Sequence, residues 1–464
     1  MDKSRWPGAA FALLVILNIP LPVLAGLVLN TNDSGPGSLR AAIANATAVD
    51  NEITFDPALS GQTITLGGSP LVINKIFSLV INATSLPDGI TISGNNASRV
   101  FQVTAGSFGT ISGLTITAGS ASDGAGIHND GGILFVTYCT VAGNHATSKG
   151  GGLYNVFGNL LMLNVTFAAN TSGNAGGGLV NESGNVVLRN TTVSGNTATV
   201  FGGGIVNDGP LAALDLENSI VAGNNGPAAG NGPDIGNRNA GTINPAGANL
   251  IGDNDTVSSV FPAGPLVGTT ASPLDPVLAP LGDYTGPSET LLPLHGSPAI
   301  DAAITPGGTP PDDQRGIARP TGPANDLGAV EVIDSDGDGL DDGYELNITG
   351  TDPNNVDTDG DGLADGPGGV VTLAAYPGGI DADGDGFVDG EQDLGTDPVV
   401  SNVGDLAPRG NPDNQINTGD LLVLFRLVTG VIQPTALEAT LADINGDTVI
   451  NVADILVLMP SILN

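Results

Sequence analysis

The sequence predicts a mainly β protein whose central part is a parallel β-solenoid with coils of about 26 residues. Three observations support this prediction. A glycine-rich tetrapeptide recurs every 26 residues, an asparagine follows each copy at the same spacing, and β-prone apolar segments lie between the copies without a helical period. The tetrapeptides are GAGI at 124–127, GGGL at 150–153 and 176–179, and GGGI at 202–205.

The repeated positions predict which side chains stack on one another. One coil cannot bury an apolar face alone, so coils stack and each residue lies above its equivalent in the next coil. The asparagines should form amide ladders, and the glycines should occupy corners that need a positive φ. A flat β-sandwich with glycine-rich turns is the alternative, but it does not explain a constant spacing. The stacked positions are Ile127, Leu153, Leu179 and Ile205, then Asn129, Asn155, Asn181 and Asn207, then Asn144, Asn170, Asn196 and Asn224.

The composition excludes several classes of protein. Twelve Lys and Arg stand against 48 Asp and Glu in 464 residues, a formal net charge of −36. This excludes a protein that binds nucleic acid through its phosphates, which needs basic residues. The 70 glycines follow no G-X-Y period, which excludes collagen, and the single Cys139 cannot form an intrachain disulfide. Residues 334–398 hold 18 acidic residues and no Lys or Arg.

The first 25 residues have the features of a secretory signal peptide. Lys3 and Arg5 precede an apolar run, and Val23-Leu24-Ala25 offers small residues for cleavage. An uncleaved membrane anchor is the alternative, but asparagine and two prolines interrupt the run before about 20 apolar residues accumulate. We therefore expect a secreted bacterial protein, extracellular or at the cell surface, with no membrane span after cleavage.

Several motifs outside the repeats resemble the choice-of-anchor Q family. They are LNTNDSGPGSLRAAIANA at 29–46, ITFDP at 53–57, NLIGD at 249–253, LLPLHGSPAIDAA at 291–303, DDQRGIARP at 312–320 and NDLGAVE at 325–331. The resemblance implies a secreted right-handed parallel β-helix with a surface or sorting module at its C-terminus. It implies no reaction.

Catalytic candidates in the solenoid are few. Asp130, Glu182 and Asp208 follow the asparagine ladder, and Glu182 and Asp208 should lie one coil apart, about 5 Å if their side chains run parallel. Such a pair could serve a metal or a retaining glycosidase, although no basic column accompanies it. Solvated turn carboxylates are the alternative. Whether the chain is an enzyme stays open, with a non-catalytic protein favoured; an enzyme would be a polysaccharide lyase or an O-glycosyl hydrolase.

A dense polar segment follows the solenoid. Buried Asp–Arg pairs in a cap that shields the last strand edges explain it without catalysis. Its members are His295, Asp301, Asp313, Arg315, Arg319, Asp326 and Glu331.

Residues 334–345, DSDGDGLDDGYE, have the spacing of a calcium loop. Calcium prefers six to eight oxygen ligands, which alternate residues of a loop can supply. Gly339 stands where such a loop turns sharply, and a disordered acidic linker is the alternative. The ligands at positions 1, 3, 5, 7, 9 and 12 would be Asp334, Asp336, Asp338, the Leu340 carbonyl, Asp342 and Glu345.

Two further loops follow with defects. Gly368 and Gln392 replace the acid at position 12, and Asp352 or Asp393 could complete these sites. The tract, with GTDP at 350–353 and 395–398, resembles thrombospondin type 3-like calcium repeats, which implies a stiff spacer once cations are bound. The remaining ligands would be Asp357, Asp359, Asp361 and Asp365, then Asp381, Asp383, Asp385 and Asp389.

The last 60 residues contain two loop-plus-helix copies, at 404–430 and 442–459, that resemble a dockerin type I module. The resemblance implies a small calcium-folded α-helical domain that docks onto a cohesin. Thr448 replaces an expected glycine, and a plain amphipathic hairpin is the alternative. The ligands would be Asp405, Asn411, Asp413, Asn417 and Asp420, then Asp443, Asn445, Asp447, the Val449 carbonyl, Asn451 and Asp454.

These predictions combine into four segments: a signal peptide at 1–25, a parallel β-helix with a C-terminal cap at 26–332, acidic calcium-binding repeats at 333–398, and a dockerin-like domain at 399–464. We expect a calcium-binding surface protein that acts in adhesion, carbohydrate binding or assembly, with a cohesin-like or surface-protein partner for its tail. The alternative is a carbohydrate-active enzyme that acts on a polysaccharide.

Overall fold

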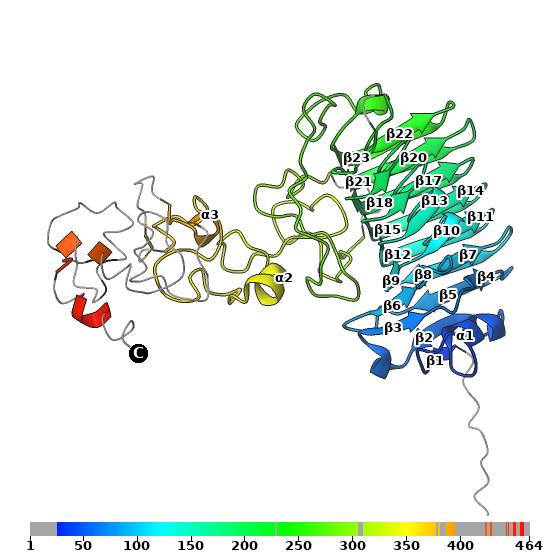
Figure 1. Cartoon of the computed structure of the whole chain (residues 1–464), viewed down its shortest axis with the longest axis horizontal. Coiled ribbons are helices and arrows are strands. Elements are labelled where there is room, and N and C mark those ends of the chain that lie inside the picture. Colours follow the sequence, from blue (N-terminus) through cyan, green and yellow to red (C-terminus); the bar gives the residue numbers. More distant parts are fainter. Residues whose placement is uncertain are drawn as a thin grey trace, which may run out of the picture.

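The computed structural model describes residues 26–227, 230–304, 310–376, 379–380 and 387–394, and also 423–424, 427–428, 442, 444, 449–451 and 455–458. The predicted signal peptide lies outside these residues. The chain forms a parallel β-solenoid of about nine turns, and a lobe and an acidic spacer extend from its side (Figure 1). This confirms the predicted fold class.

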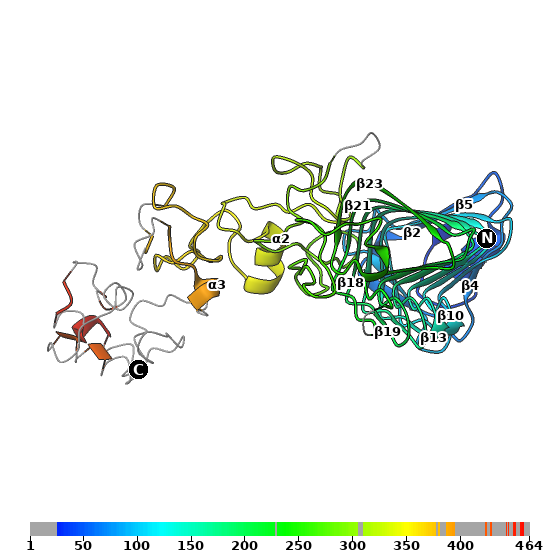
Figure 2. The ribbon, with the colours of Figure 1, turned by 90° about the horizontal axis from the view of Figure 1, so that it is seen from above.

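Parallel strands of successive coils build the three sheets of the solenoid, seen along the stack in Figure 2. The largest sheet contains β1 (Leu27–Val28), β2 (Glu52–Phe55), β5 (Ser78–Asn82), β8 (Phe108–Ser112), β12 (Ile133–Ala142), β15 (Asn159–Ala168), β18 (Asn185–Ser194), β21 (Ala213–Val221) and β23 (Thr242–Ile251), with β3 (Gln62–Thr65), β6 (Ile90–Ser93) and β9 (Leu114–Thr117) beside them. A second sheet contains β4 (Leu71–Ile73), β7 (Phe101–Val103), β11 (Ile127–Asp130), β14 (Leu153–Val156), β17 (Leu179–Glu182), β20 (Ile205–Asp208) and β22 (Ile235–Arg238). The smallest contains β10 (Ser120–Asp123), β13 (His145–Lys149), β16 (Thr171–Ser172) and β19 (Thr197–Ala198).

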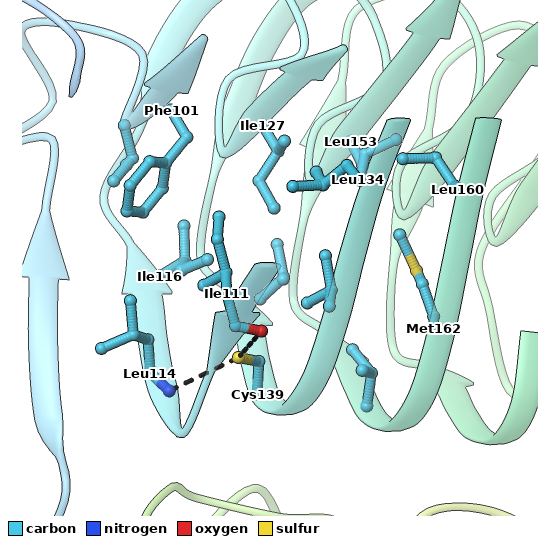
Figure 3. Close-up of a cluster of buried hydrophobic side chains, with 14 of the residues drawn as sticks. Phe101, Ile111, Leu114, Ile116, Ile127, Leu134, Cys139, Leu153, Leu160 and Met162 are labelled. Carbon is cyan, nitrogen blue, oxygen red and sulfur yellow. Dashed lines mark hydrogen bonds between the residues drawn. The ribbon is translucent and has the colours of Figure 1, made fainter. Parts of the chain in front are cut away.

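The strand register confirms the 26-residue repeat. Ile127 pairs with Leu153, Leu153 with Leu179, and Leu179 with Ile205, so the predicted column is one continuous buried stripe. Figure 3 shows part of this core, where Cys139 lies among apolar side chains and its thiol contacts the Ile111 carbonyl. Burial raises the pKa of Cys139 to about 12, so the thiol is inert at neutral pH.

Both predicted asparagine ladders are present. In the first, each Nδ2 donates to the Oδ1 of the next coil over 2.8–3.1 Å, from Asn129 through Asn155, Asn181 and Asn207 to Asn237. The second runs from Asn144 through Asn170 and Asn196 to Asn224 over 2.9 Å per step. It ends on the buried Asp234, which accepts from Asn224 Nδ2 at 2.8 Å. The repeat spacing does not predict Asn237 or Asp234, because the chain between coils is longer there.

Each long strand of the largest sheet bends at one residue with a positive φ, which divides the sheet into two arms. Asparagine, which tolerates this conformation, stands at three of these bends: Asn164, Asn190 and Asn218. Tyr138 takes the same place with φ 54°, and its hydroxyl donates to Asp312 at 2.8 Å.

Short helices cover both ends of the solenoid. α1 (Leu39–Asn45) begins at Ser38, whose Oγ accepts from Ala41 N, and it buries Leu39 and Ile43 in the core. A 3₁₀ turn, η1 (Pro57–Leu59), follows β2. At the other end, η2 (Asp255–Val257) brings Phe261 against the same core. Covered ends prevent edge-to-edge pairing of the strands.

Residues 264–304 and 310–332 form a lateral lobe that packs along the second arm of the largest sheet. Its hydrogen bonds reach Thr140, Thr166 and Thr192 on three successive coils. The polar segment that we expected to cap the last strands therefore lies over the side of the solenoid, while η2 covers the end. Within the described residues, no helix has the length and apolar character needed to cross a membrane.

Candidate metal sites

The first acidic loop folds around its own aspartates. Asp334 accepts from Gly337 N at 2.7 Å and from Gly339 N at 3.0 Å, and Asp338 accepts from Leu340 N at 2.8 Å. Both glycines have a positive φ, 83° and 98°, which brings their N–H groups onto the carboxylate. The loop is thus closed and leads into α2 (Asp342–Tyr344) and the π-helical turn η3 (Glu345–Thr349).

Two carboxylate clusters converge in this loop. Ligand oxygens of Asp334, Asp336 and Asp338 lie within 4.8 Å of one another, and so do those of Asp338, Glu345 and Asp365. Asp365 comes from the second loop, so two consecutive repeats contribute to one cluster. The sequence places Asp365 at position 9 of its own loop and does not predict this sharing.

Several of these oxygens are buried and lack a donor. Within the described residues, Asp336 Oδ2, Asp338 Oδ2 and Glu345 Oε2 have no hydrogen-bond partner. A buried carboxylate oxygen without a donor or a cation is costly. Hard divalent cations such as Ca²⁺ prefer an all-oxygen donor set of this kind. The residues present therefore fit a bound cation.

The raised pKa values of these carboxylates also indicate that the clusters fit a bound cation. Burial, and then repulsion from neighbouring aspartates, raises the pKa of Glu345 to about 8. Burial also raises the pKa of Asp338 to about 7 and that of Asp365 to about 6, against the hydrogen bonds that each accepts. Without a cation, part of this site binds protons at neutral pH.

The second loop is a structural copy of the first. Asp357 accepts from Gly360 N at 2.7 Å and from Gly362 N at 2.8 Å, which matches Asp334 in the first loop. Asp357, Asp359 and Asp361 form a third cluster within 4.8 Å. Burial, followed by repulsion from Asp361, raises the pKa of Asp359 to about 7. Tyr376 donates its hydroxyl to Asp357 Oδ2 at 2.8 Å.

One backbone hydrogen bond recurs in all three loops. Asp342 N donates to Ile333 O at 2.8 Å, Asp365 N to Val356 O at 2.9 Å, and Asp389 N to Ile380 O at 2.7 Å. The bond of the third repeat lies ahead of α3 (Glu391–Leu394). Its ligands Asp381, Asp383 and Asp385 lie outside the described residues.

The remaining predicted spacer residues have varied surroundings. Asp342 accepts from Ser335 N and Oγ, at 2.9 and 2.7 Å. Asp352 is exposed and accepts from Asn354 N. Leu340 and Glu391 are buried, and Gln392 is exposed.

A buried arginine joins the first loop to the lateral lobe. The Arg315 guanidinium contacts Asp313 of the lobe at 3.1 Å and Asp341 of the loop at 3.2 Å, and all three side chains are at most 2% exposed. Tyr344 stacks on Tyr284 of the lobe with ring centroids 6.1 Å apart. Asp341 lies between two predicted ligands, so the loop's geometry and its attachment are coupled.

Other members of the polar segment pair within the lobe. Arg319 contacts Glu331, which is fully buried. Asp301 N donates to Asp326 at 2.7 Å, and His295 is exposed.

Two of the three catalytic candidates on the solenoid contact basic side chains. Glu182 and Asp208 pair in register on adjacent coils, as predicted. Glu182 contacts Lys149 Nζ at 2.5 Å and accepts from Tyr154, while Asp208 contacts Arg238 at 2.8 Å. Asp130 is exposed. The sequence places Lys149 elsewhere in the repeat; its long side chain reaches the next coil.

Most predicted ligands of the C-terminal tail lie outside the described residues: Asp405, Asn411, Asp413, Asn417, Asp420, Asp443, Asn445, Asp447 and Asp454. Of the two that are described, Asn451 Nδ2 donates to Val449 O at 2.7 Å. Described apolar residues of the tail, among them Leu424 and Leu458, cluster with Leu363 and Ile380 of the spacer.

Comparisons with known proteins agree with the geometry of the first loop. Residues 334–356 match the family of bacterial TSP3 repeats, which bind calcium. No curated protein and no solved structure matches the chain. The match covers the first loop and ends at residue 356, just before the second loop, and it does not extend to the solenoid.

Proposed function

We propose that the chain is an exported calcium-binding β-helix protein of the bacterial cell surface or extracellular space. Calcium would occupy the acidic loops and convert them into a stiff spacer. The solenoid would present its long faces for adhesion or carbohydrate binding, at a distance that the spacer sets. TSP3 repeats are typically found in extracellular proteins, which supports this location.

The shared cluster of Asp338, Glu345 and Asp365 is the observation that carries the proposal. A cation bound there would link the first two loops through three carboxylates, while Arg315 fixes the first loop to the lobe. Without cations, the uncompensated carboxylates of the spacer repel one another and favour an expanded chain. Extracellular loops of this kind bind calcium at about 10⁻⁴–10⁻³ M, so external calcium would saturate them.

Calorimetric titration of the full chain with calcium tests this proposal. We expect saturable binding in that range, and about a tenfold loss of affinity at one site in Asp365→Asn, because one charged ligand is lost. The matched control, Glu52→Gln, removes an exposed carboxylate of the solenoid, outside the acidic loops, and should bind like the wild type. Absence of binding up to 10⁻² M calcium, about tenfold above the expected range, would refute the proposal.

The tail would supply the attachment. Its resemblance to a dockerin supports calcium-dependent docking onto a cohesin-like or other surface partner. A tail fused to a carrier protein can be tested against a panel of cohesins with calcium and with chelator. Capture that chelator abolishes would support docking; no capture by any cohesin would leave attachment to another partner as the outcome and refute the cohesin assignment.

A carbohydrate-active enzyme is the second candidate, because Glu182 and Asp208 lie on adjacent coils. Their contacts with Lys149 and Arg238 favour a structural role, since each charge is already paired. Incubation with a polysaccharide panel and calcium, followed by assays for unsaturated products and reducing ends, tests for a lyase or hydrolase. Turnover that Glu182→Ala or Asp208→Ala abolishes would favour the enzyme, and no product from any substrate would exclude it for that panel.

A further inference from the structure

Six successive coils carry threonine at the same outward position of the largest sheet. Strand register places Thr63, Thr91, Thr115, Thr140, Thr166 and Thr192 in one column. The lateral lobe covers the last three. Of the first three, Thr63 on β3 lies beyond the lobe, while Thr91 on β6 and Thr115 on β9 lie at its edge, where Thr115 is buried to 9% exposure.

The covered threonines show which groups this column recognises. Thr166 Oγ1 donates to Gln314 Oε1 at 2.8 Å, and Thr192 Oγ1 accepts from Ala329 N at 3.0 Å. Thr140 Oγ1 donates to the Glu289 carbonyl. Each hydroxyl meets a polar group of the lobe, either as donor or as acceptor.

The neighbouring column lies two residues further along each strand. On the covered coils it holds Ala142, Ala168 and Ser194, and the two alanines pack against Leu291 of the lobe. On the open coils it holds Thr65, Ser93 and Thr117, which are register partners. The open part of the face therefore presents two columns of hydroxyls.

A groove with a cavity volume of about 270 Å³ lies where this open face meets the lobe. Gly89 lets the two walls approach, because a Cβ there would come within 1.7 Å of Pro287 O. Within the described residues, the hydroxyls of the three threonines that line it have no hydrogen-bond partner in the protein. The lining residues are Asp88, Ile90, Thr91, Thr115, Thr117, Asp283, Gly286, Pro287, Ser288 and Glu289.

The lining selects a ligand by charge and hydrogen bonding. It contains three carboxylates and no basic side chain, which disfavours uronates, sulfates and phosphates. Partial burial, and then the charge of Asp283, raises the pKa of Glu289. Hydroxyl groups that donate and accept suit a sugar, and the volume is near the lower end for small-molecule sites, about 300–1,000 Å³.

We propose that this groove binds an amino-sugar unit of a polysaccharide, with the ammonium group at Asp283 and Glu289 and the sugar hydroxyls on Thr91, Thr115 and Thr117. This inference specifies the carbohydrate-binding part of the proposed function and rests on it. It places carbohydrate recognition on the largest sheet of the solenoid, whereas Glu182 lies on another sheet. The groove is part of the solenoid and lobe, so saturating calcium is needed only to keep the spacer ordered.

The test is calorimetric titration of the full chain in the presence of calcium. The ligands are three trisaccharides: the trimers of glucosamine, of N-acetylglucosamine and of galacturonate. We expect the glucosamine trimer to bind, the acetylated trimer to bind at least tenfold more weakly, and the galacturonate trimer not to bind. Glu289→Gln should weaken glucosamine binding about tenfold or more, since a charged hydrogen bond is lost. Thr115→Val, nearly isosteric and favourable in a strand, should weaken it about threefold to tenfold.

Thr63→Val is the matched control, because it removes a hydroxyl from the same column outside the groove. It should bind like the wild type, and unchanged far-ultraviolet circular dichroism would show that each variant folds. Equal binding of the amine and acetylated trimers, or preference for galacturonate, would overturn the inference. Displacement of the sugar by calcium would also overturn it, because Asp283 and Glu289 would then be ligands of a cation. If the spacer still binds calcium while no sugar binds, this inference fails and the calcium proposal stands.

Discussion

We expect calcium binding to release protons from the closely spaced carboxylates of the first two loops. Four acids of the first two loops have pKa values of about 6 to 8 in the absence of cations. Because a carboxylate must lose its proton to bind a metal, calcium should displace these protons. At pH 7 a pKa of about 8 leaves about 0.9 proton on Glu345, and a pKa of about 7 leaves about 0.5 on each of Asp338 and Asp359. Saturation with calcium should therefore release about two protons per chain.

The perturbation that isolates this effect is Glu345→Gln. It removes the acid with the most raised pKa, so the release at pH 7 should fall to about one proton per chain. Glu52→Gln, which removes an exposed acid of the solenoid, should release as many protons as the wild type.

Calorimetry in two buffers of different ionisation enthalpy, at saturating calcium, measures the release directly. The wild-type value should also decline toward zero as the pH approaches 9, because all four acids are then already ionised. Calcium binding with no proton release at pH 7 would refute the reasoning. Equal release from Glu345→Gln and the wild type would refute the assignment to Glu345.

Three further predictions concern stability. Because burial raises the pKa of Asp338 and Glu345 above their unfolded values, the calcium-free spacer should be most stable below about pH 4 and lose stability as the pH rises to about 8. With calcium bound, the same rise in pH should stabilise the spacer. Urea titrations followed by tyrosine fluorescence measure this stability, and the same pH trend with and without calcium would contradict the prediction. Arg315→Met should destabilise the junction by about 3–5 kcal/mol, since it leaves the buried carboxylate of Asp341 unpaired; proteolysis between lobe and spacer checks this, and unchanged protection would be the contrary result. Asn181→Ala should cost the solenoid about 1–3 kcal/mol by interrupting a buried ladder, which a thermal melt at fixed calcium measures against the wild type.

The sequence predicts features that depend on spacing alone. A constant 26-residue period determines the register, so the apolar column at Leu153 and the ladder through Asn155 follow directly. The ligand spacing of the first loop likewise predicts a cluster around Asp334.

Contacts between segments far apart in the sequence are different, because no local pattern records them. The sharing of Asp365 depends on how two loops pack, and the side-on position of the lobe depends on hydrogen bonds such as Thr166 to Gln314 across 148 residues. Lys149 reaches Glu182 through a flexible side chain that spans a coil boundary. The threonine column depends on the register of the early coils, whose spacing along the sequence is irregular.

Hydrogen exchange of the full chain, in calcium and in chelator, tests the central claim of a calcium-ordered spacer on a calcium-independent solenoid. We predict that chelation removes protection from the amides of residues 334–365, such as Gly339 and Gly362, which bond loop carboxylates. The strands β12, β15 and β18 should keep theirs, because their ladders and core involve no acidic loop. Loss of protection throughout the solenoid in chelator, or unchanged protection in the loops, would contradict the account.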